Sequence, residues 1–447
     1  MKKKMNIQLS ENFTYKKLIR FTIPTIIMMI LTSIYGIIDG ICVSNKVGEN
    51  AFASINLIMP ALMIFGSIGF MIGTGGSAIV SKTIGEGKKE KANQYFSMLI
   101  YILIIIGTII SIIGMILIEN ITILLGADET MFQDCVVYGR TLLIFLVPFM
   151  LQNCFQSFLI VAEKPSFGLM ISIISGVVNI ILDILLIYIF DMKVFGAAIA
   201  TGISQLVGSI IPIIFFARKN DSPLKLIKTK FEFKAICKAF TNGSSEMLTN
   251  LSLSLVNMLY NMQLLKYANS DGVVAYGIIM YVGFIFIGTY LGYSIGTAPI
   301  IGYHYGAKNT EELKSILKKS LRIIAITAII MTSIAEIAAG LLASIFVSKN
   351  AALLEMTTNA IRLFALSYLI SGFNIFASSF FTALNNGVVS AIISFLRTLV
   401  FQVAAILILP LIWELNGIWL AVVVAEILAL IVSVIFLISN RKKYNYI

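Results

Sequence analysis

The stretch of sequence that decides the fold is SIISGVVNIILDILLIY, residues 172–188. It is long and apolar enough to cross a bilayer, yet it carries Asp183 in its middle. An ionised carboxylate facing lipid at that depth costs roughly 2.5 to 3.5 kcal/mol, so Asp183 is expected to face protein or water. Asn179, Ser175 and Ser172 precede it at helical spacing and share its face. A polar stripe inside a span is typical of an ion site or a water-filled cavity.

The composition places the whole chain in a membrane. Of 447 residues 58% are hydrophobic and only 12% are charged, which excludes a soluble globular protein of ordinary kind. The net charge of +11 does not indicate a nucleic-acid partner, because the lysines fall in loops between apolar runs. The four cysteines show no metal-binding spacing and predict no disulfide framework. We therefore expect an all-α polytopic membrane protein whose immediate surroundings are lipid.

Apolar runs of about 20 residues predict twelve transmembrane helices. The predicted spans are 18–43, 51–80, 95–118, 136–161, 167–190, 194–217, 240–265, 273–303, 323–347, 357–384, 387–412 and 416–439. Most Lys and Arg residues lie in alternate connections, and the exceptions on the other side are Lys46, Arg140, Lys193, Lys266, Lys349 and Arg362. Because cytoplasmic loops carry the excess of basic residues, both termini are expected in the cytoplasm and the protein in the plasma membrane.

An internal repeat divides the chain into two similar parts. Residues 75–88 read GGSAIVSKTIGEGK and have a counterpart in residues 296–309, GTAPIIGYHYGAKN. Nearly the same displacement aligns Arg140 with Arg362. Six helices per part is an even number, so the two bundles enter the membrane from the same side as a parallel repeat.

The repeat predicts three regions of the chain. They are an N-terminal six-helix lobe at 1–217, a basic cytoplasmic linker at 218–238 and a C-terminal six-helix lobe at 239–447. A substrate site is expected between the lobes. The repeat also acts as an internal control, because the displacement places Phe401 opposite Asn179 and Ala405 opposite Asp183. The polar stripe is therefore not required by the repeated fold.

The first predicted span carries a second carboxylate. Asp39 lies one helical turn from Tyr35, so this span has a polar face of its own that can meet the stripe around Asp183. Two carboxylates close together in a low dielectric resist simultaneous ionisation, which favours capture of a proton. The simpler interpretation places Asp39 at the helix end among lipid headgroups.

At this point the chain resembles the multidrug and toxic compound extrusion (MATE) family over essentially its whole length. The resemblance rests on the twelve spans in two parallel bundles, the GEGK and GAKN loops at 85–88 and 306–309, Asp39, and Asn179 four residues before Asp183. It implies an antiporter that exports cationic, lipophilic or aromatic compounds in exchange for H⁺ or Na⁺. The positions that match the family's cation site are Asp39, Asn179, Asp183 and Thr201. Their oxygen atoms would bind Na⁺ if that is the coupling ion, and no other cofactor is expected.

A substrate cavity is predicted from polar residues on other spans. The candidates are Tyr35, Gln152, Asn153, Glu246, Asn250 and Asn257. Glu246, Asn250 and Asn257 share one side of the seventh span, where the acid would attract cationic drugs. The structural alternative is hydrogen bonding between packed helices. Arg397 is expected to pair with Glu336 or Glu426.

Other functions fit the sequence less well. A membrane enzyme would need clustered catalytic residues, whereas the chain has one histidine and neither HExxH nor GxSxG. A major facilitator carrier would need a different loop after the second span. The remaining alternative is a flippase or exporter of lipid-linked or other amphipathic substrates on the same fold. Its cavity should be rich in arginine, whereas the interior charges here are mostly acidic. The partners expected are small organic molecules, with the chain acting as a monomer.

Overall fold

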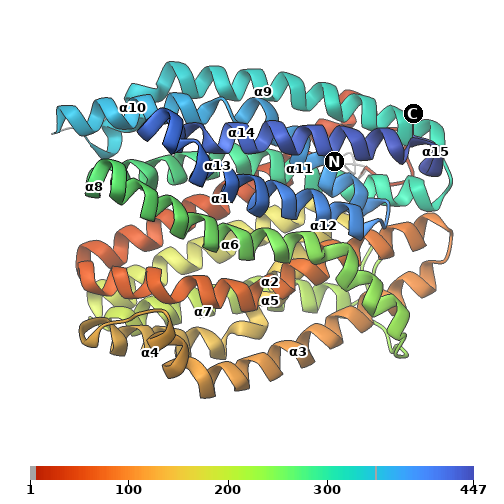
Figure 1. Ribbon diagram of the computed structural model, residues 1–447. Coiled ribbons are helices and arrows are strands. Elements are labelled where there is room, and N and C mark those ends of the chain that lie inside the picture. The colour runs from red at the N-terminus through yellow and green to blue at the C-terminus, as the bar shows by residue number, and fades with distance from the viewer. Residues whose placement is uncertain (1–6, 348–349, 447) are drawn as a thin grey trace, which may run out of the picture.

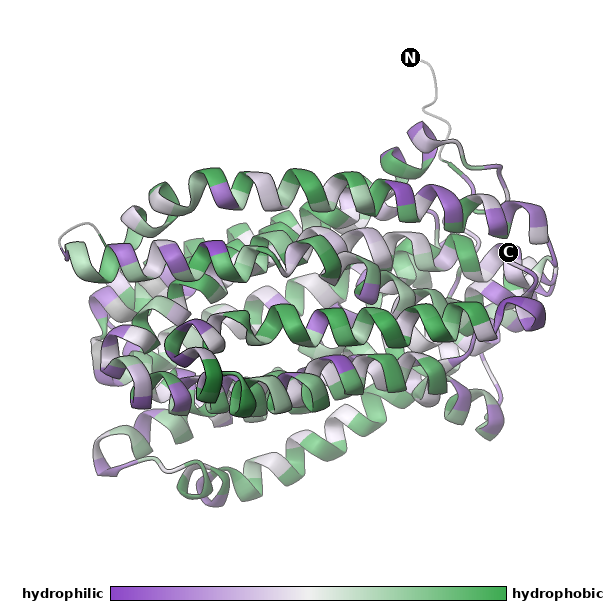
Figure 2. Ribbon diagram, turned by 45° about the horizontal axis from the view of Figure 1, so that its top comes forward, coloured by the Kyte–Doolittle hydropathy of each residue, from purple (hydrophilic) through white to green (hydrophobic). Residues whose placement is uncertain are grey.

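The computed structural model describes residues 7–347 and 350–446 and shows a bundle of long helices. The helices run roughly side by side, and the first and last described residues lie at the same end of the bundle (Figure 1). Hydrophobic residues cover the helices along their length, and hydrophilic residues gather at the ends, most densely near the C-terminus (Figure 2). This distribution is the one that a bilayer-spanning bundle requires.

The first half of the chain forms seven α-helices and one short π-helix. Their bounds are α1 (Tyr15–Lys46), α2 (Glu49–Gly85), α3 (Lys89–Leu124), α4 (Glu129–Ile144), α5 (Leu146–Val161), α6 (Pro165–Asp183), the π-helix η1 (Ile184–Ile189) and α7 (Lys193–Ala217). A non-helical linker follows, until α8 begins at Phe233. The last residues of the predicted linker, 233–238, are therefore helical.

The second half repeats this plan. Its elements are α8 (Phe233–Gly306), α9 (Thr310–Phe346), α10 (Ala351–Ala365), α11 (Tyr368–Ala383), α12 (Gly387–Phe395), the π-helix η2 (Leu396–Val400), α13 (Phe401–Ile408), α14 (Pro410–Ser439) and α15 (Arg441–Tyr444). The long helix α8 contains non-helical backbone at Asn269, so it is two crossings joined by a kink.

The helices account for the twelve predicted spans. Within the described residues nine helices are long and apolar enough to cross a membrane, and two bent pairs raise this number to eleven. The break of α8 at Asn269 supplies the twelfth. The predicted spans 136–161 and 357–384 are each broken, into α4 and α5 with a bend of 58° and into α10 and α11 with a bend of 45°. The predicted spans did not show these bends, because each bent pair was predicted as one continuous span.

Two separate hydrophobic cores hold the bundle together. One consists of residues between Val43 and Ala239, and the other consists mostly of residues from Val256 to Tyr446. Helix α1 contributes to both halves, because its Leu18 and Phe21 pack in the C-terminal core while its outer part packs along α6. It therefore bridges the two bundles.

The two halves are packed tightly at the end of the bundle where the described chain begins and ends. A methyl group added to Gly306 on α8 would lie 2.0 Å from the Lys82 carbonyl oxygen on α2, and one on Gly85 would lie 2.0 Å from the Tyr303 carbonyl oxygen. Only glycine allows the two backbones to approach so closely. The molecule is thus closed at this end.

The segment before α1 fastens the same end. The backbone N–H of Leu9 donates to Glu163 in the N-terminal half at 2.8 Å, and that of Phe13 donates to Glu312 in the C-terminal half at 2.8 Å. Lys319 on α9 also donates to the Phe13 carbonyl. Because Leu9 and Phe13 are buried, residues 7–14 form a strap across the two halves.

Candidate functional site

Helix α6 carries the polar stripe into the interior of the N-terminal half. Ser172, Ser175, Asn179 and Asp183 are all buried, and Asp183 is 0% exposed. The apolar residues between them face outward, since Ile173, Ile174, Val177 and Ile181 are exposed on the bundle surface. Hydrophobic patterning therefore turns the stripe inward, as predicted.

The helix changes its geometry directly after Asp183. Its α-helical part ends there, and residues 184–189 continue as the π-helix η1. The equivalent span of the other half also contains a π-helix, η2, which carries Arg397. Such segments disturb the regular hydrogen-bond ladder and often occur at functional sites.

Helix α1 brings Asp39 close enough to Asp183 for the two carboxyl groups to influence each other electrostatically. The close packing of α1 on α6 depends on Gly176, where an added methyl group would lie 2.2 Å from the Tyr35 ring. Tyr35, predicted as a cavity residue, is therefore packed on α6 one turn from Asn179. Gly176 therefore allows α1 and α6, which carry the two acidic residues, to pack closely.

All four residues of the predicted cation site have buried polar atoms with no hydrogen-bond partner among the described residues. These atoms are Asp39 Oδ1, Asn179 Nδ2, both carboxylate oxygens of Asp183, and Thr201 Oγ1. Buried polar groups are normally satisfied, because leaving one unpaired costs roughly 1–3 kcal/mol. The two carboxylates and the Thr201 hydroxyl supply oxygen atoms that suit a proton or a small hard cation, while the unpaired Asn179 Nδ2 is a hydrogen-bond donor.

The structure adds two residues that sequence reasoning missed. Tyr138 on α4 is buried beside Thr201 and both carboxylates, and Cys42 on α1 lies near both carboxylates. Cys42 follows Asp39 by three residues, so helical spacing could have placed it on the same face. Tyr138 gives no such signal, because only the packing of α4 on its neighbours brings it inward.

The predicted cavity residues Gln152 and Asn153 belong to the same half. Gln152 on α5 donates to the Ser175 hydroxyl at 3.2 Å, and Ser175 donates to the Ser204 carbonyl on α7 at 2.5 Å. Asn153 is buried, and its Nδ2 has no described hydrogen-bond partner. A polar chain therefore joins α5, α6 and α7 beside the acidic residues.

Glu246 lines a pocket of about 50 Å³ whose walls come from both halves. The wall is rich in hydroxyl groups and contains Arg397. As expected, Arg397 pairs with a buried acid, since its Nε and Nη2 each lie 2.8 Å from Glu426 Oε1. Asn374 also donates to Glu426, at 2.7 Å. The charge of Glu426 is thus balanced inside the C-terminal half, whereas Glu246 faces the boundary between the halves.

The other two cavity candidates lie elsewhere on α8. Asn250 donates to the Glu246 carbonyl of its own helix at 3.1 Å. Asn257 accepts a hydrogen bond from Tyr276 at 2.8 Å, which ties the two arms of α8 together. Of the six predicted cavity residues, Glu246 lines the pocket between the halves.

A second small pocket of about 30 Å³ adjoins the acidic residues. Thr201 and Gln205 form its polar wall, and Met59, Met63 and Phe149 are among its apolar lining. Thr201 therefore belongs both to the group around Asp183 and to an apolar pocket.

Curated relatives match the chain over nearly its full length. Multidrug export protein MepA of Staphylococcus saprophyticus is 24% identical over 99% of this chain and 98% of its own length. The protein of the same name from Staphylococcus aureus strain NCTC 8325 is 23% identical, over 96% of this chain and 94% of its own length.

Solved structures share the fold. An outward-facing multidrug resistance MATE family transporter superimposes with a TM-score of 0.93 at 23% identity, covering 100% of both chains. A MATE crystal structure in complex with MaL6 gives a TM-score of 0.92 at 22% identity, covering 99% of this chain and 98% of the other. The predicted fold of two six-helix bundles is confirmed by these neighbours.

The MatE family model matches the chain twice, over residues 24–185 and 247–408. The two matches are displaced by nearly the same distance as the two glycine-lysine loops, so the repeat seen in the sequence is the repeat of the family. The family consists of transporters, which agrees with the prediction that the protein is not an enzyme. The chain belongs to the MatE family.

Proposed function

We propose that the protein is a secondary antiporter that exports cationic or lipophilic organic compounds and takes up H⁺ or Na⁺ in exchange. One observation carries this proposal. Asp39, Asn179 and Asp183 lie together inside the N-terminal half, Thr201 adjoins them through Tyr138, and each of the four has a buried polar atom without a described partner. A group of this kind is costly unless it binds something.

A proton or a sodium ion would relieve the cost at this group in different ways. A proton shared between Asp39 and Asp183 removes one of two like charges and supplies a hydrogen bond. A sodium ion would be held by the carboxylate oxygens, the Asn179 carbonyl and the Thr201 hydroxyl. In both cases the uptake of one positive charge stabilises the contact between α1 and α6.

Thr201 offers a route from cation binding to substrate binding. It lines the same pocket as Met59 and Met63. Methionine side chains adapt to ligands of varied shape. At about 30 Å³ this pocket is smaller than an organic drug, so substrate must widen it and move the helices around Thr201. The bound substrate and the bound cation would then require different arrangements of α1, α6 and α7, so that binding of one would disfavour binding of the other. The MepA relatives, named as multidrug exporters, support this class of substrate.

The ion gradients of a cell supply enough free energy for export. One charge moving across about 100 mV releases about 2.3 kcal/mol. Each tenfold of substrate accumulation costs about 1.4 kcal/mol. When the substrate is a monovalent cation exchanged one for one, the voltage cancels and the concentration gradient of the coupling ion drives export.

The proposed setting is the cytoplasmic membrane, with the strap, the basic loops and both termini on the cytoplasmic side. The closed end of the bundle would then face the cytoplasm. Substrate would leave from the opposite end.

Transport by vesicles with imposed gradients tests the proposal. The purified chain is reconstituted in liposomes, and ethidium movement is followed under a pH gradient and, separately, under a Na⁺ gradient of equal size. The proposal expects one of the two gradients to drive ethidium against its own gradient. Equal ethidium movement with and without both gradients would refute antiport.

A further inference from the structure

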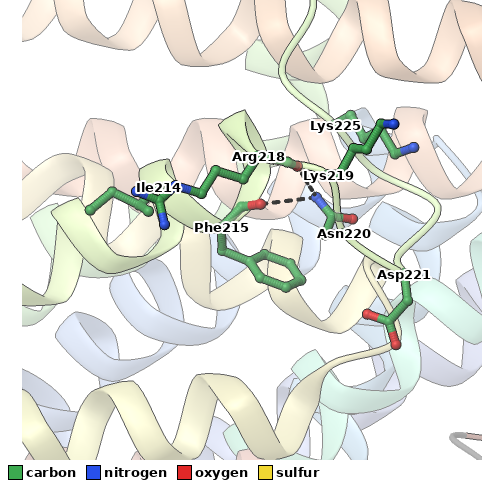
Figure 3. A pocket seen from close by; sticks show the side chains of 7 residues that line it. All are labelled: Ile214, Phe215, Arg218, Lys219, Asn220, Asp221 and Lys225. Carbon is green, nitrogen blue, oxygen red and sulfur yellow. Dashed lines mark hydrogen bonds between the residues drawn. The ribbon is translucent and has the colours of Figure 1, made fainter.

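The turn between α7 and the linker frames a pocket of about 630 Å³ on the surface of the molecule (Figure 3). Its framework is fixed by hydrogen bonds. The Asn220 amide donates to the Phe215 carbonyl at 2.9 Å and to the Arg218 carbonyl at 3.2 Å. The linker then returns to the helix, because Leu226 N–H donates to the Phe216 carbonyl at 2.9 Å. The shape of the pocket is therefore fixed by hydrogen bonds of the turn.

Three basic side chains line this pocket without a described ion-pair partner. They are Arg218, Lys219 and Lys225. The acid of the turn, Asp221, binds Lys164 of the α5–α6 loop at 2.8 Å and lies apart from Arg218 and Lys225 (Figure 3). Lys225 is held in place through its backbone, which donates to the Asn93 side chain on α3 at 2.7 Å. The lining thus carries three basic side chains and one carboxylate, Asp221, which forms an ion pair with Lys164 outside the lining, so the basic groups are in excess.

Apolar surface continues from the basic pocket along α7. Ile214 lines the pocket and is 44% exposed, and Ile210 lies one turn further along the same face and is 41% exposed. Both belong to the apolar part of a membrane-spanning helix. A ligand that fits this surface has an anionic head and an apolar tail. A free inorganic anion would use only the basic half.

We propose that this pocket binds an anionic phospholipid, with its phosphate beside Arg218, in the positive field of Lys219 and Lys225, and an acyl chain along Ile214 and Ile210. Basic clusters directly beside a membrane-spanning helix attract anionic lipid headgroups. Arginine and lysine donate charge-assisted hydrogen bonds to phosphate oxygens. The lipid would hold the linker between the two halves against the membrane surface.

Native mass spectrometry of the purified full-length chain tests this site. The detergent-solubilised protein is titrated with phosphatidylglycerol, phosphatidylcholine or inorganic phosphate. We expect phosphatidylglycerol to bind most tightly and inorganic phosphate not to displace it. The double variant Arg218→Gln/Lys225→Gln should weaken phosphatidylglycerol binding about thirtyfold, as expected for two basic charges at a membrane surface.

Matched variants distinguish lipid binding at this pocket from general attraction of the lipid to basic residues. Lys228→Gln/Lys230→Gln removes two exposed charges from the same linker outside the pocket and should leave binding unchanged. Arg218→Lys/Lys225→Arg keeps the charge and should retain most of the binding. The proposal is overturned if Arg218→Gln/Lys225→Gln, with an unchanged melting temperature, binds phosphatidylglycerol as the wild type does. Equal binding of phosphatidylcholine, or displacement by inorganic phosphate, would also overturn it.

Discussion

Asp39 on α1 and Asp183 on α6 place two carboxyl groups together inside the N-terminal half, and no described donor reaches Asp183 or the buried Oδ1 of Asp39. The contrast with the C-terminal half is informative, because there the buried Glu426 is paired with Arg397 and Asn374. In the C-terminal half Glu426 is thus neutralised by a neighbouring arginine. In the N-terminal half Asp183 has no such basic neighbour among the described residues, and we propose that a mobile cation neutralises it.

The first prediction concerns stability. Replacing Asp183 by Asn removes one of two neighbouring like charges and gives Asp39 an N–H donor, so the apparent melting temperature in detergent should rise. Asp128→Ala is a control that should lower the melting temperature instead of raising it. Asp128 caps α4 by accepting from the N–H groups of Thr130 and Met131, and its loss should cost roughly 0.5–2 kcal/mol. A lower melting temperature for Asp183→Asn would show that Asp183 has a structural partner.

The second prediction uses Cys42 as a reporter of the site. Cys42 is partly exposed and lies near both carboxylates, whereas Cys237 is exposed and distant in sequence. The rate of N-ethylmaleimide labelling of Cys42, relative to Cys237 in the same chain, should fall when the coupling cation is added. Na⁺ is compared with choline at fixed pH, and H⁺ is tested by lowering the pH. In Asp183→Asn the ratio should no longer respond, and a response that persists would place the cation elsewhere.

The third prediction concerns the closed end of the bundle. Gly306→Ala would place a methyl group 2.0 Å from the Lys82 carbonyl oxygen and should force α2 and α8 apart. Hydrogen exchange of backbone amides in residues 75–88 should therefore become faster. Gly277→Ala is the matched control on the same helix, because an added methyl group there meets nothing within 4 Å. Equal exchange in both variants would show that the close contact does not hold this end shut.

The fourth prediction concerns the strap at residues 7–14. Glu163 accepts the Leu9 N–H, and burial raises the pKa of its carboxyl above the ordinary value, although the Leu9 hydrogen bond and Lys164 and Lys89 oppose the shift and Glu11 adds to it. A raised pKa means that Glu163 binds a proton more tightly in the folded molecule than in the unfolded chain, so the folded state with its docked strap should become more stable as pH falls.

Glu163→Gln keeps the hydrogen-bond acceptor and removes the charge. Protection of the Leu9 amide from hydrogen exchange should therefore be higher in this variant than in the wild type at pH 8, and the difference should shrink toward pH 5. A difference in protection that stays constant across this pH range would mean that Glu163 does not titrate while the strap is docked on it.

Much of the architecture could be predicted from the sequence, for reasons visible in single elements. The span around Asp183 is recognisable because an acid in an apolar run must face inward, and α6 turns it inward. The repeat is recognisable because the loops at 85–88 and 306–309 keep glycines where the two halves touch.

Other features depend on packing that sequence patterns do not record. The bend at Phe145 separates α4 from α5 within what was predicted as one continuous span. Tyr138 reaches the carboxylates because of how α4 packs, and Asn257 is engaged by Tyr276 from the other arm of α8. A local pattern gives the face of a helix but not the neighbour that the face meets.

The central claim is that Asp39 and Asp183 together take up the cation that drives export. It is tested most directly by gradient-driven ethidium transport in liposomes containing Asp39→Asn, Asp183→Asn or the control Asp271→Asn, which changes an exposed acid on α8. The account predicts that both site variants lose gradient-driven accumulation by at least about tenfold, which corresponds to about 1.4 kcal/mol or more of transport free energy. Asp271→Asn should transport as the wild type does. Wild-type accumulation by either site variant would contradict it.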